Sequence, residues 1–224
     1  MSKSVRKEKD IEIRKNEILD AVERIYEKGK FDSVTMEEIA KEAEFTKQTL
    51  YSYFYGKEEI MATLYIRAAN SINQMIKSTL DKKENMSGFE KLDVMREVFT
   101  DIARKKPLYT KMMAIYLVKD LSDYKDLGIY DQIVTKNNNL TNYMADCINK
   151  GMLDGSIPGG VDVQNGVLFL KALILGTVSM IVYNDQYMRQ ELNLNPLEVL
   201  KDIFAFSMRA FRVFDAKDAK TEQE

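Results

Sequence analysis

Apolar side chains recur at helical spacing along most of the chain. Within residues 11–28, Ile18, Val22 and Ile25 lie four and three residues apart with charged residues between them, which is the spacing of one helix face. The longest such segment, residues 57–83, has neither glycine nor proline and predicts a helix about 40 Å long. No β-branched alternating run stands out, so the pattern predicts an all-α fold.

The rest of the chain predicts five more helices, separated by glycine, proline and polar residues. Their ranges are 89–105, 107–121, 128–152, 162–184 and 196–214. The plainest loop is GMLDGSIPGGVD, which holds four of the ten glycines. Proline stands in the first turn of two of these helices, where the amide hydrogen that it lacks would have no partner. The charged segment after Phe214 is expected to be disordered.

Two short helices are predicted between the first helix and the long one. Gly29 ends the first helix. Thr35 and Glu38 form a capping box at the start of the next, and Thr46 is the N-cap of the helix after that. The break at Glu44 predicts a tight turn between them. Two short helices joined by a tight turn, behind a longer helix, are the arrangement of a helix-turn-helix.

The second of these short helices divides into an apolar and a polar side. Leu50 and Phe54, four residues apart, form the apolar side. The other side carries hydroxyl, amide and amine groups, on Lys47, Gln48, Thr49, Tyr51 and Tyr53. A helix-turn-helix uses such groups to bind DNA. The alternative is an ordinary helical hairpin with a solvated exterior.

Residues 18–60, ILDAVERIYEKGKFDSVTMEEIAKEAEFTKQTLYSYFYGKEEI, resemble the N-terminal domain of the tetracycline-repressor (TetR) family of transcriptional regulators. The matching features are Ile18-Leu19-Asp20-Ala21, Gly29, Thr35, Ile39-Ala40, Ala43, Thr49-Leu50-Tyr51, Phe54 and Lys57-Glu58-Glu59-Ile60. Two positions depart from the family: Glu44 stands where glycine is common, and Tyr53 where histidine is frequent. A side chain in a left-handed turn at position 44 costs up to about 1 kcal/mol.

The resemblance implies a homodimer that binds a palindromic DNA operator, represses transcription and is released by a small-molecule effector. It implies a DNA-binding domain over residues 1–56 and a ligand-sensing and dimerisation domain over 57–215, with a disordered tail over 216–224. The residues expected at the DNA are Thr35, Thr46, Lys47, Gln48, Thr49, Tyr51, Tyr53 and Lys57. Lys47 and Gln48 occupy the first turn of the recognition helix, where side chains reach base edges.

The most apolar run is GVLFLKALILGTVSMIVY, residues 166–183. Its length is at the lower limit for a membrane span, but Lys171 near its middle favours a helix buried in a soluble protein. The resemblance implies that the last two helices of two subunits form a four-helix dimer interface. The residues expected there are Ala172, Gly176, Phe204 and Phe211.

Methionine and tyrosine side chains are frequent in the middle of the chain and suit an adaptable ligand pocket. The candidates for ligand contact are Tyr109, Met112, Met113, Tyr116, Tyr143, Phe169 and Lys171. Two alternatives stay open. The apolar residues are also typical of a simple core, and Lys171 either extends to the rim of an interface or attracts an acidic ligand.

Composition excludes several kinds of chemistry. Histidine is absent and Cys147 is the one cysteine, which excludes histidine-dependent nucleophiles, histidine metal sites and an intramolecular disulfide. We expect no metal, no cofactor and no enzymatic activity. The net charge of −2 weighs little against DNA, because the charge of the contacting face decides phosphate affinity. No apolar secretory segment follows the charged N-terminus, so we expect a cytoplasmic protein.

Three rival functions stay open on the sequence alone. A helical enzyme would need a buried pair of carboxylates in a cleft. An interaction scaffold would not bind DNA. A DNA binder without a sensor would have a filled core in its larger domain.

Overall fold

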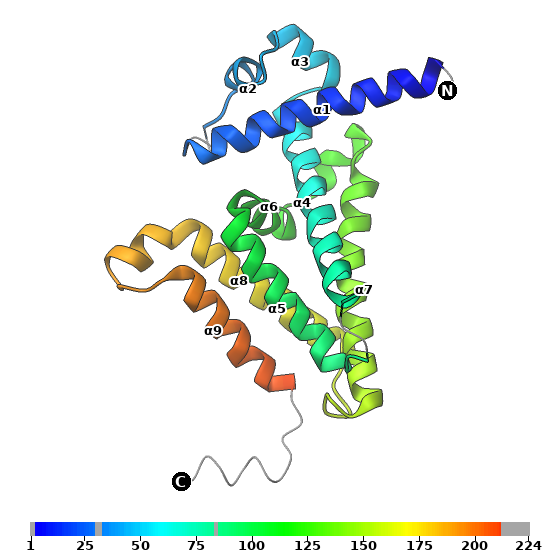
Figure 1. Ribbon diagram of the computed structural model, residues 1–224, viewed down its shortest axis with the longest axis vertical. Helices are drawn as coiled ribbons and strands as arrows, with labels where there is room; N and C mark the ends of the chain where they lie inside the picture. The colour runs from blue at the N-terminus through cyan, green and yellow to red at the C-terminus, as the bar shows by residue number, and fades with distance from the viewer. Residues whose placement is uncertain (1–2, 30–32, 83–84, 212–224) are drawn as a thin grey trace. The chain divides into compact units, whose positions relative to one another are not determined.

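The computed structural model describes residues 3–29, 33–82 and 85–211 (Figure 1). These residues form helices and connecting turns without strands, which confirms the predicted all-α fold. The elements are α1 (Lys3–Glu27), α2 (Met36–Glu42), α3 (Lys47–Tyr53), α4 (Lys57–Leu80), α5 (Gly88–Lys105), α6 (Pro107–Val118), the 3₁₀ turn η1 (Ser122–Leu127), α7 (Tyr130–Asp154), α8 (Val163–Gln190), α9 (Pro196–Met208) and the 3₁₀ turn η2 (Arg209–Phe211).

Several helix ends differ from the predicted ones. Helix α1 begins at Lys3 rather than at residue 11, because its charged first turns have good helix propensity without an apolar stripe. Helix α8 continues to Gln190 through a kink at Asn184, whose φ is −125°. Helix α9 ends at Met208. The predicted tail, 216–224, lies outside the described residues.

The chain forms two compact units. The first is Met1–Arg67 with Asp120–Ile133, and the second is Ala68–Lys119 with Val134–Glu224. Helices α4 and α7 each run through both units. The predicted boundary at residue 57 stays a prediction.

The first unit has its core where α1 packs on α2 and α3. Figure 1 shows the two short helices on one side of α1. The core side chains come from all three helices and from the start of α4. Those at most 1% exposed include Ile18, Ala21, Val22, Ile39, Leu50, Phe54 and Ile60. This burial confirms that Leu50 and Phe54 are the apolar side of the second short helix.

Arg67 joins α4 to α1 within the first unit. Its Nη1 donates to Asp20 Oδ1 at 2.6 Å and to Glu23 Oε1 at 2.9 Å, and its Nη2 donates to Asn16 Oδ1 at 2.9 Å. These hydrogen bonds fix the orientation of α4 against α1, because the donors of a guanidinium have a rigid planar geometry.

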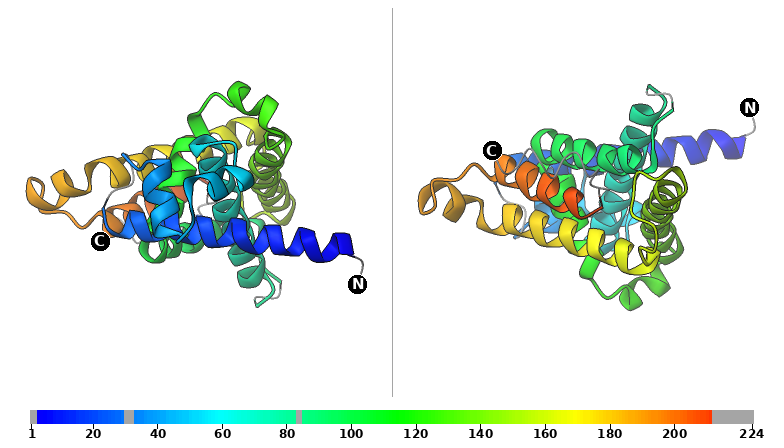
Figure 2. Two further views of the ribbon diagram at one scale, coloured as in Figure 1. Left: turned by 90° about the horizontal axis from the view of Figure 1, so that it is seen from above. Right: turned by 90° about the horizontal axis from the view of Figure 1, so that it is seen from below.

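The second unit is built around α5, α6, α8 and α9, which pack on one another. Helices α8 and α9 lie side by side (Figure 2). Phe99 of α5 stacks on Phe204 of α9 with ring centroids 6.4 Å apart. Gly88 lies so close to Gly151 of α7 that a Cβ at Gly88 would overlap the Gly151 backbone.

Candidate nucleic-acid interface

The turn between α2 and α3 is closed by backbone hydrogen bonds. Ala43 N donates to Ile39 O at 2.9 Å, and Phe45 N donates to Ala40 O at 2.8 Å. Glu44 lies between them with φ of 59°, which is the left-handed conformation that favours glycine. The turn therefore keeps a tight geometry with a glutamate at its strained position.

The short helices begin at the predicted caps. Thr35 Oγ1 accepts from Glu38 N at 3.2 Å while Glu38 Oε2 accepts from Thr35 N at 2.9 Å. Thr46 Oγ1 accepts from Thr49 N at 3.1 Å. These bonds confirm the capping box and the second N-cap. The hydroxyls of Thr35 and Thr46 thus hold helix ends, whether or not they also meet phosphate.

The polar side of α3 is open to solvent. Lys47 and Gln48 are exposed, and Tyr51 has 47% of its surface exposed. Thr49 is half-buried, with its hydroxyl 2.8 Å from that of Thr46. Helix α3 thus presents its first turn outward, while Leu50 beneath it is fully buried.

The two remaining predicted DNA contacts are less exposed. Tyr53 is half-buried, with its ring centroid 6.3 Å from that of Phe45. Lys57 is half-buried at the first residue of α4. All eight predicted DNA contacts stay predictions.

An ion pair links α3 back to α2, and the sequence pattern did not indicate it. The Lys47 ammonium donates to Glu37 Oε1. This hydrogen bond lowers the pKa of the Glu37 carboxyl and raises the pKa of the Lys47 ammonium. Both groups therefore stay charged at neutral pH.

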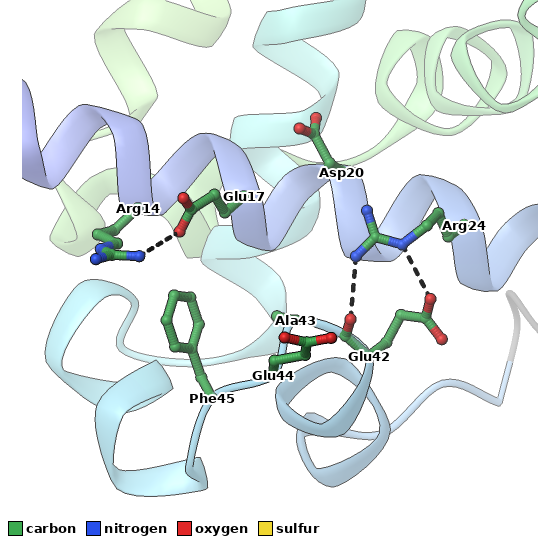
Figure 3. A pocket seen from close by; sticks show the side chains of 8 residues that line it. All are labelled: Arg14, Glu17, Asp20, Arg24, Glu42, Ala43, Glu44 and Phe45. Atoms are coloured by element: carbon green, nitrogen blue, oxygen red, sulfur yellow. Dashed lines mark hydrogen bonds and ion pairs between the residues drawn. The ribbon is translucent and has the colours of Figure 1, made fainter.

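A surface pocket of about 360 Å³ lies between α1 and the α2–α3 turn (Figure 3). Its residues are Arg14, Glu17, Asp20, Arg24, Glu42, Ala43, Glu44 and Phe45. Most of its charges pair locally: Arg14 with Glu17 and Arg24 with Glu42, each at 2.9 Å. Four carboxylates against two guanidiniums make this pocket unsuited to DNA phosphates.

Four of the predicted ligand contacts come together on α6. Tyr109, Met112, Met113 and Tyr116 are all at most 5% exposed, and their spacing of three and four residues places them on one face of the helix. Two polar residues of the same helix are also buried, Thr110 and Lys111. Thr110 Oγ1 has no hydrogen-bond partner among the described residues.

The other predicted ligand contacts lie elsewhere in the second unit. The Tyr143 hydroxyl donates to Lys91 O at 2.5 Å. Phe169 is 43% exposed and packs on Phe211 with ring centroids 5.7 Å apart. Lys171 is half-buried. Thr110 was missed by sequence reasoning, although a threonine and a lysine inside the apolar segment PLYTKMMAIYLV were a visible signal.

The four residues expected at a dimer interface have different surroundings. Ala172 and Gly176 are exposed, and a Cβ at Gly176 would meet nothing within 4 Å. Phe204 and Phe211 are buried, against Phe99 and Phe169 respectively.

Exposed apolar residues continue along α8 from this point. Leu168 and Met180 are 62% and 48% exposed, and with Ala172 and Gly176 they recur every four residues. By length and composition, the window Val163–Met180 is apolar enough to cross a membrane, with a mean hydropathy of 1.4 and 33% of it buried. Core helices of soluble proteins also have this composition. The half-buried Lys171 lies near the middle of the window.

Burial accounts for the protonation of two groups on α7. The pKa of the Cys147 thiol is raised to about 11, mainly because the thiol is buried. Burial also raises the pKa of Tyr143. Both are therefore neutral at physiological pH, and Cys147 is a small apolar side chain rather than a nucleophile.

Solved structures with a similar fold are regulators of transcription. The fatty acid degradation regulator FadR from Bacillus halodurans has a TM-score of 0.65 at 16% identity, over 85% of this chain and 92% of that chain. The ketosteroid transcriptional regulator KstR2 of Mycobacterium tuberculosis has 0.65 at 16% identity, over 90% and 96%. FadR from Bacillus subtilis, in complex with stearoyl-CoA, has 0.63 at 22% identity, over 88% and 98%. The TM-scores show a common fold, and at these identities they show the fold alone.

The sequence itself matches a family model. No curated protein matches the chain. Residues 18–64 match the model for bacterial regulatory proteins of the tetR family. That segment contains α2, the turn with Glu44, α3 and the first part of α4, so the match covers the whole helix-turn-helix. The chain therefore carries the DNA-binding domain of the TetR family of transcriptional regulators, a non-enzymatic family.

Proposed function

We propose that the protein is an effector-responsive repressor that binds a palindromic operator as a homodimer. The observation that carries this proposal is the division of α3. Leu50 is fully buried and Phe54 beyond it is 1% exposed, while Lys47, Gln48 and Tyr51 face solvent. A recognition helix needs this division, because it must be fixed to the fold while its outer side enters the major groove.

The proposed DNA contacts fall into two classes. Thr35, Thr46, Tyr51, Tyr53 and Lys57 carry groups suited to phosphate oxygens and would position the protein. Lys47 and Gln48 would read bases, since lysine reaches guanine acceptors and glutamine bonds an adenine edge bidentately. Thr49, half-buried behind Thr46, would support the phosphate contacts.

The proposed dimer uses the exposed apolar stripe of α8. Leu168, Ala172, Gly176 and Met180 form that stripe, and Phe206 of α9 is 76% exposed. Contiguous apolar surface of this kind marks an interaction site. Gly176, with open space beside it, would allow a helix of a second copy to approach closely. A dimer would place two DNA-binding heads, the helix-turn-helix units of its two copies, on the two halves of a palindrome.

The proposed effector is an apolar molecule with a polar group, bound against α6. Its apolar part would meet Tyr109, Met112, Met113 and Tyr116. Its polar group would hydrogen-bond the hydroxyl of Thr110, which has no partner among the described residues. A buried hydroxyl without a partner is unfavourable, so a ligand that satisfies it gains affinity. The similar fold of a regulator crystallised with stearoyl-CoA makes acyl thioesters the first class to test.

The proposed regulation is a coupling between effector and operator. Effector binding would favour a conformation in which the two heads are wrongly spaced for successive major grooves. Helix α4 runs through both units, and Arg67 would carry its movement to α1 through Asp20 and Glu23. Couplings of this kind are typically about 1–3 kcal/mol, which is enough to vacate an operator held near its working affinity.

Mapping the DNA sites that the protein protects across its source genome tests the proposal. We expect a small set of palindromic sites upstream of genes, and purified protein should bind them in titrations. Acyl thioesters of different chain lengths, added to those titrations, should weaken binding. Sites that lack two-fold symmetry, or an absence of specific sites, would favour the interaction scaffold. Specific sites that no acyl thioester releases would remove that effector class alone.

A further inference from the structure

Glu37 places a carboxylate beside the group proposed to read DNA bases. It lies in the first turn of α2, and Lys47 is the first residue of α3. Their side chains are 66% and 48% exposed, and they pair across the turn. The folded helix-turn-helix therefore attaches an anion to the start of the recognition helix.

In the first turn of α2 this carboxylate favours the helix dipole, a role that Glu38 in the same turn also fills. Glu38 completes the capping box of α2, and Glu42 binds Arg24 and Lys28 of α1. Glu37 has neither of these roles, and exposed ion pairs contribute little to stability. The functional surface gives a better reason for its presence than the core does.

We propose that Glu37 is an affinity-determining residue that competes with DNA for Lys47. This inference rests on the proposed role of Lys47 in DNA binding. On a random sequence, transferring Lys47 from the carboxylate to a phosphate replaces one ion pair with another and leaves Glu37 facing the anionic backbone. The exchange therefore gains little.

The operator offers a different exchange. There Lys47 meets guanine acceptors at a fixed position, and the other contacts of the head hold it in register. The hydrogen bonds to the base outweigh the broken ion pair, but the operator complex bears the whole cost of breaking it. Glu37 thus lowers affinity for all DNA, and lowers operator affinity at least as much as affinity for a random sequence. The pair therefore sets how tightly the recognition helix holds its operator.

The test compares Glu37→Gln with Glu44→Gln. Both changes remove one exposed carboxylate from the same helix-turn-helix and keep the side-chain shape. Glu44 lies in the pocket beside α1 (Figure 3) and has no ion-pair partner among the described residues. Binding is measured by fluorescence anisotropy at several salt concentrations. The probes are a duplex selected by the wild-type protein from a random library and a random-sequence duplex of the same length.

We expect Glu37→Gln to bind the random duplex about two- to fivefold more tightly per head. The slope of log affinity against log salt should steepen by about one per head, because each freed Lys47 neutralises a phosphate. Affinity for the selected duplex should rise at least as much. Glu44→Gln should change neither duplex by a comparable factor, and Glu37→Asp should return both affinities toward the wild-type values.

Lys47→Ala distinguishes a wrong role for Glu37 from a wrong role for Lys47. If it weakens binding to the selected duplex while Glu37→Gln matches Glu44→Gln on the random duplex, the role of Glu37 is wrong and the proposed interface stands. If Lys47→Ala leaves affinity for the selected duplex unchanged, Lys47 does not read DNA. The proposed role of Glu37 is then wrong as well, because it acts through Lys47.

Discussion

At the scale of single residues, Gln48 is the side chain whose proposed role is easiest to isolate. It is exposed in the first turn of α3, with no part in the caps that Thr35 and Thr46 supply. Gln48→Ala should relax base preference at one operator position per half-site, at a cost of about 1–3 kcal/mol against the correct base. Titrations on duplexes that vary one position at a time measure this. An unchanged preference profile would remove Gln48 from base reading.

Lys57 should behave differently, because a phosphate contact carries no sequence information. Lys57→Ala should weaken binding to all duplexes alike. The slope of log affinity against log salt should become shallower by about one for each phosphate that is no longer neutralised, and so by about two for the dimer. The measurement is a salt series on operator and random duplexes. A sequence-dependent weakening, or an unchanged slope, would contradict a phosphate contact.

The sequence predicted those site residues whose hydrogen-bond partners are only a few positions away along the chain. The caps at Thr35 and Thr46 depend on amides three residues away, so a short motif indicates them. The pair of Glu37 with Lys47 depends on how the turn folds α3 against α2, which no local pattern contains. Thr110 was visible as a polar residue in an apolar helix, but only the folded chain shows that its hydroxyl has no partner within the described part of the structure.

At the scale of elements, the α2–α3 turn holds a backbone strain at Glu44. Its φ of 59° is unfavourable for a residue with a Cβ. Glu44→Gly should raise the free energy of unfolding by up to about 1 kcal/mol, reduced by the greater freedom of glycine in the unfolded chain. Denaturant titration measures the change. A destabilised variant would mean that the Glu44 side chain contributes contacts that outweigh the strain.

Sequence predicted the helices better than it predicted what covers them. Periodicity places an apolar stripe on α9, and Phe204 was assigned to a partner subunit from the resemblance. The ring instead stacks on Phe99 in the same chain, so its place in a dimer interface stays a prediction. A stripe indicates that a helix face is covered, and only packing shows by which neighbour. The charged first turns of α1 had no stripe and were therefore missed.

At the scale of the whole molecule, the exposed stripe on α8 requires a partner if the protein acts as a dimer. Gly176→Asp should split that dimer, because an unpaired charge buried at the interface costs several kcal/mol. Gly176→Ala is the matched control and should weaken it less, because a methyl group buries no unpaired charge. Sedimentation equilibrium at micromolar protein measures both. A wild-type monomer, or a Gly176→Asp variant that stays dimeric, would place the interface elsewhere.

The stoichiometry of the complex with DNA tests the central claim most directly. Native mass determination of the purified chain on a duplex selected from a random library should give two chains per palindromic site. The same duplex with one half-site scrambled should bind at least about tenfold more weakly, because only one head then makes specific contacts. A single chain bound to an asymmetric sequence, or no selective binding at all, would contradict a two-headed regulator that reads DNA through α3.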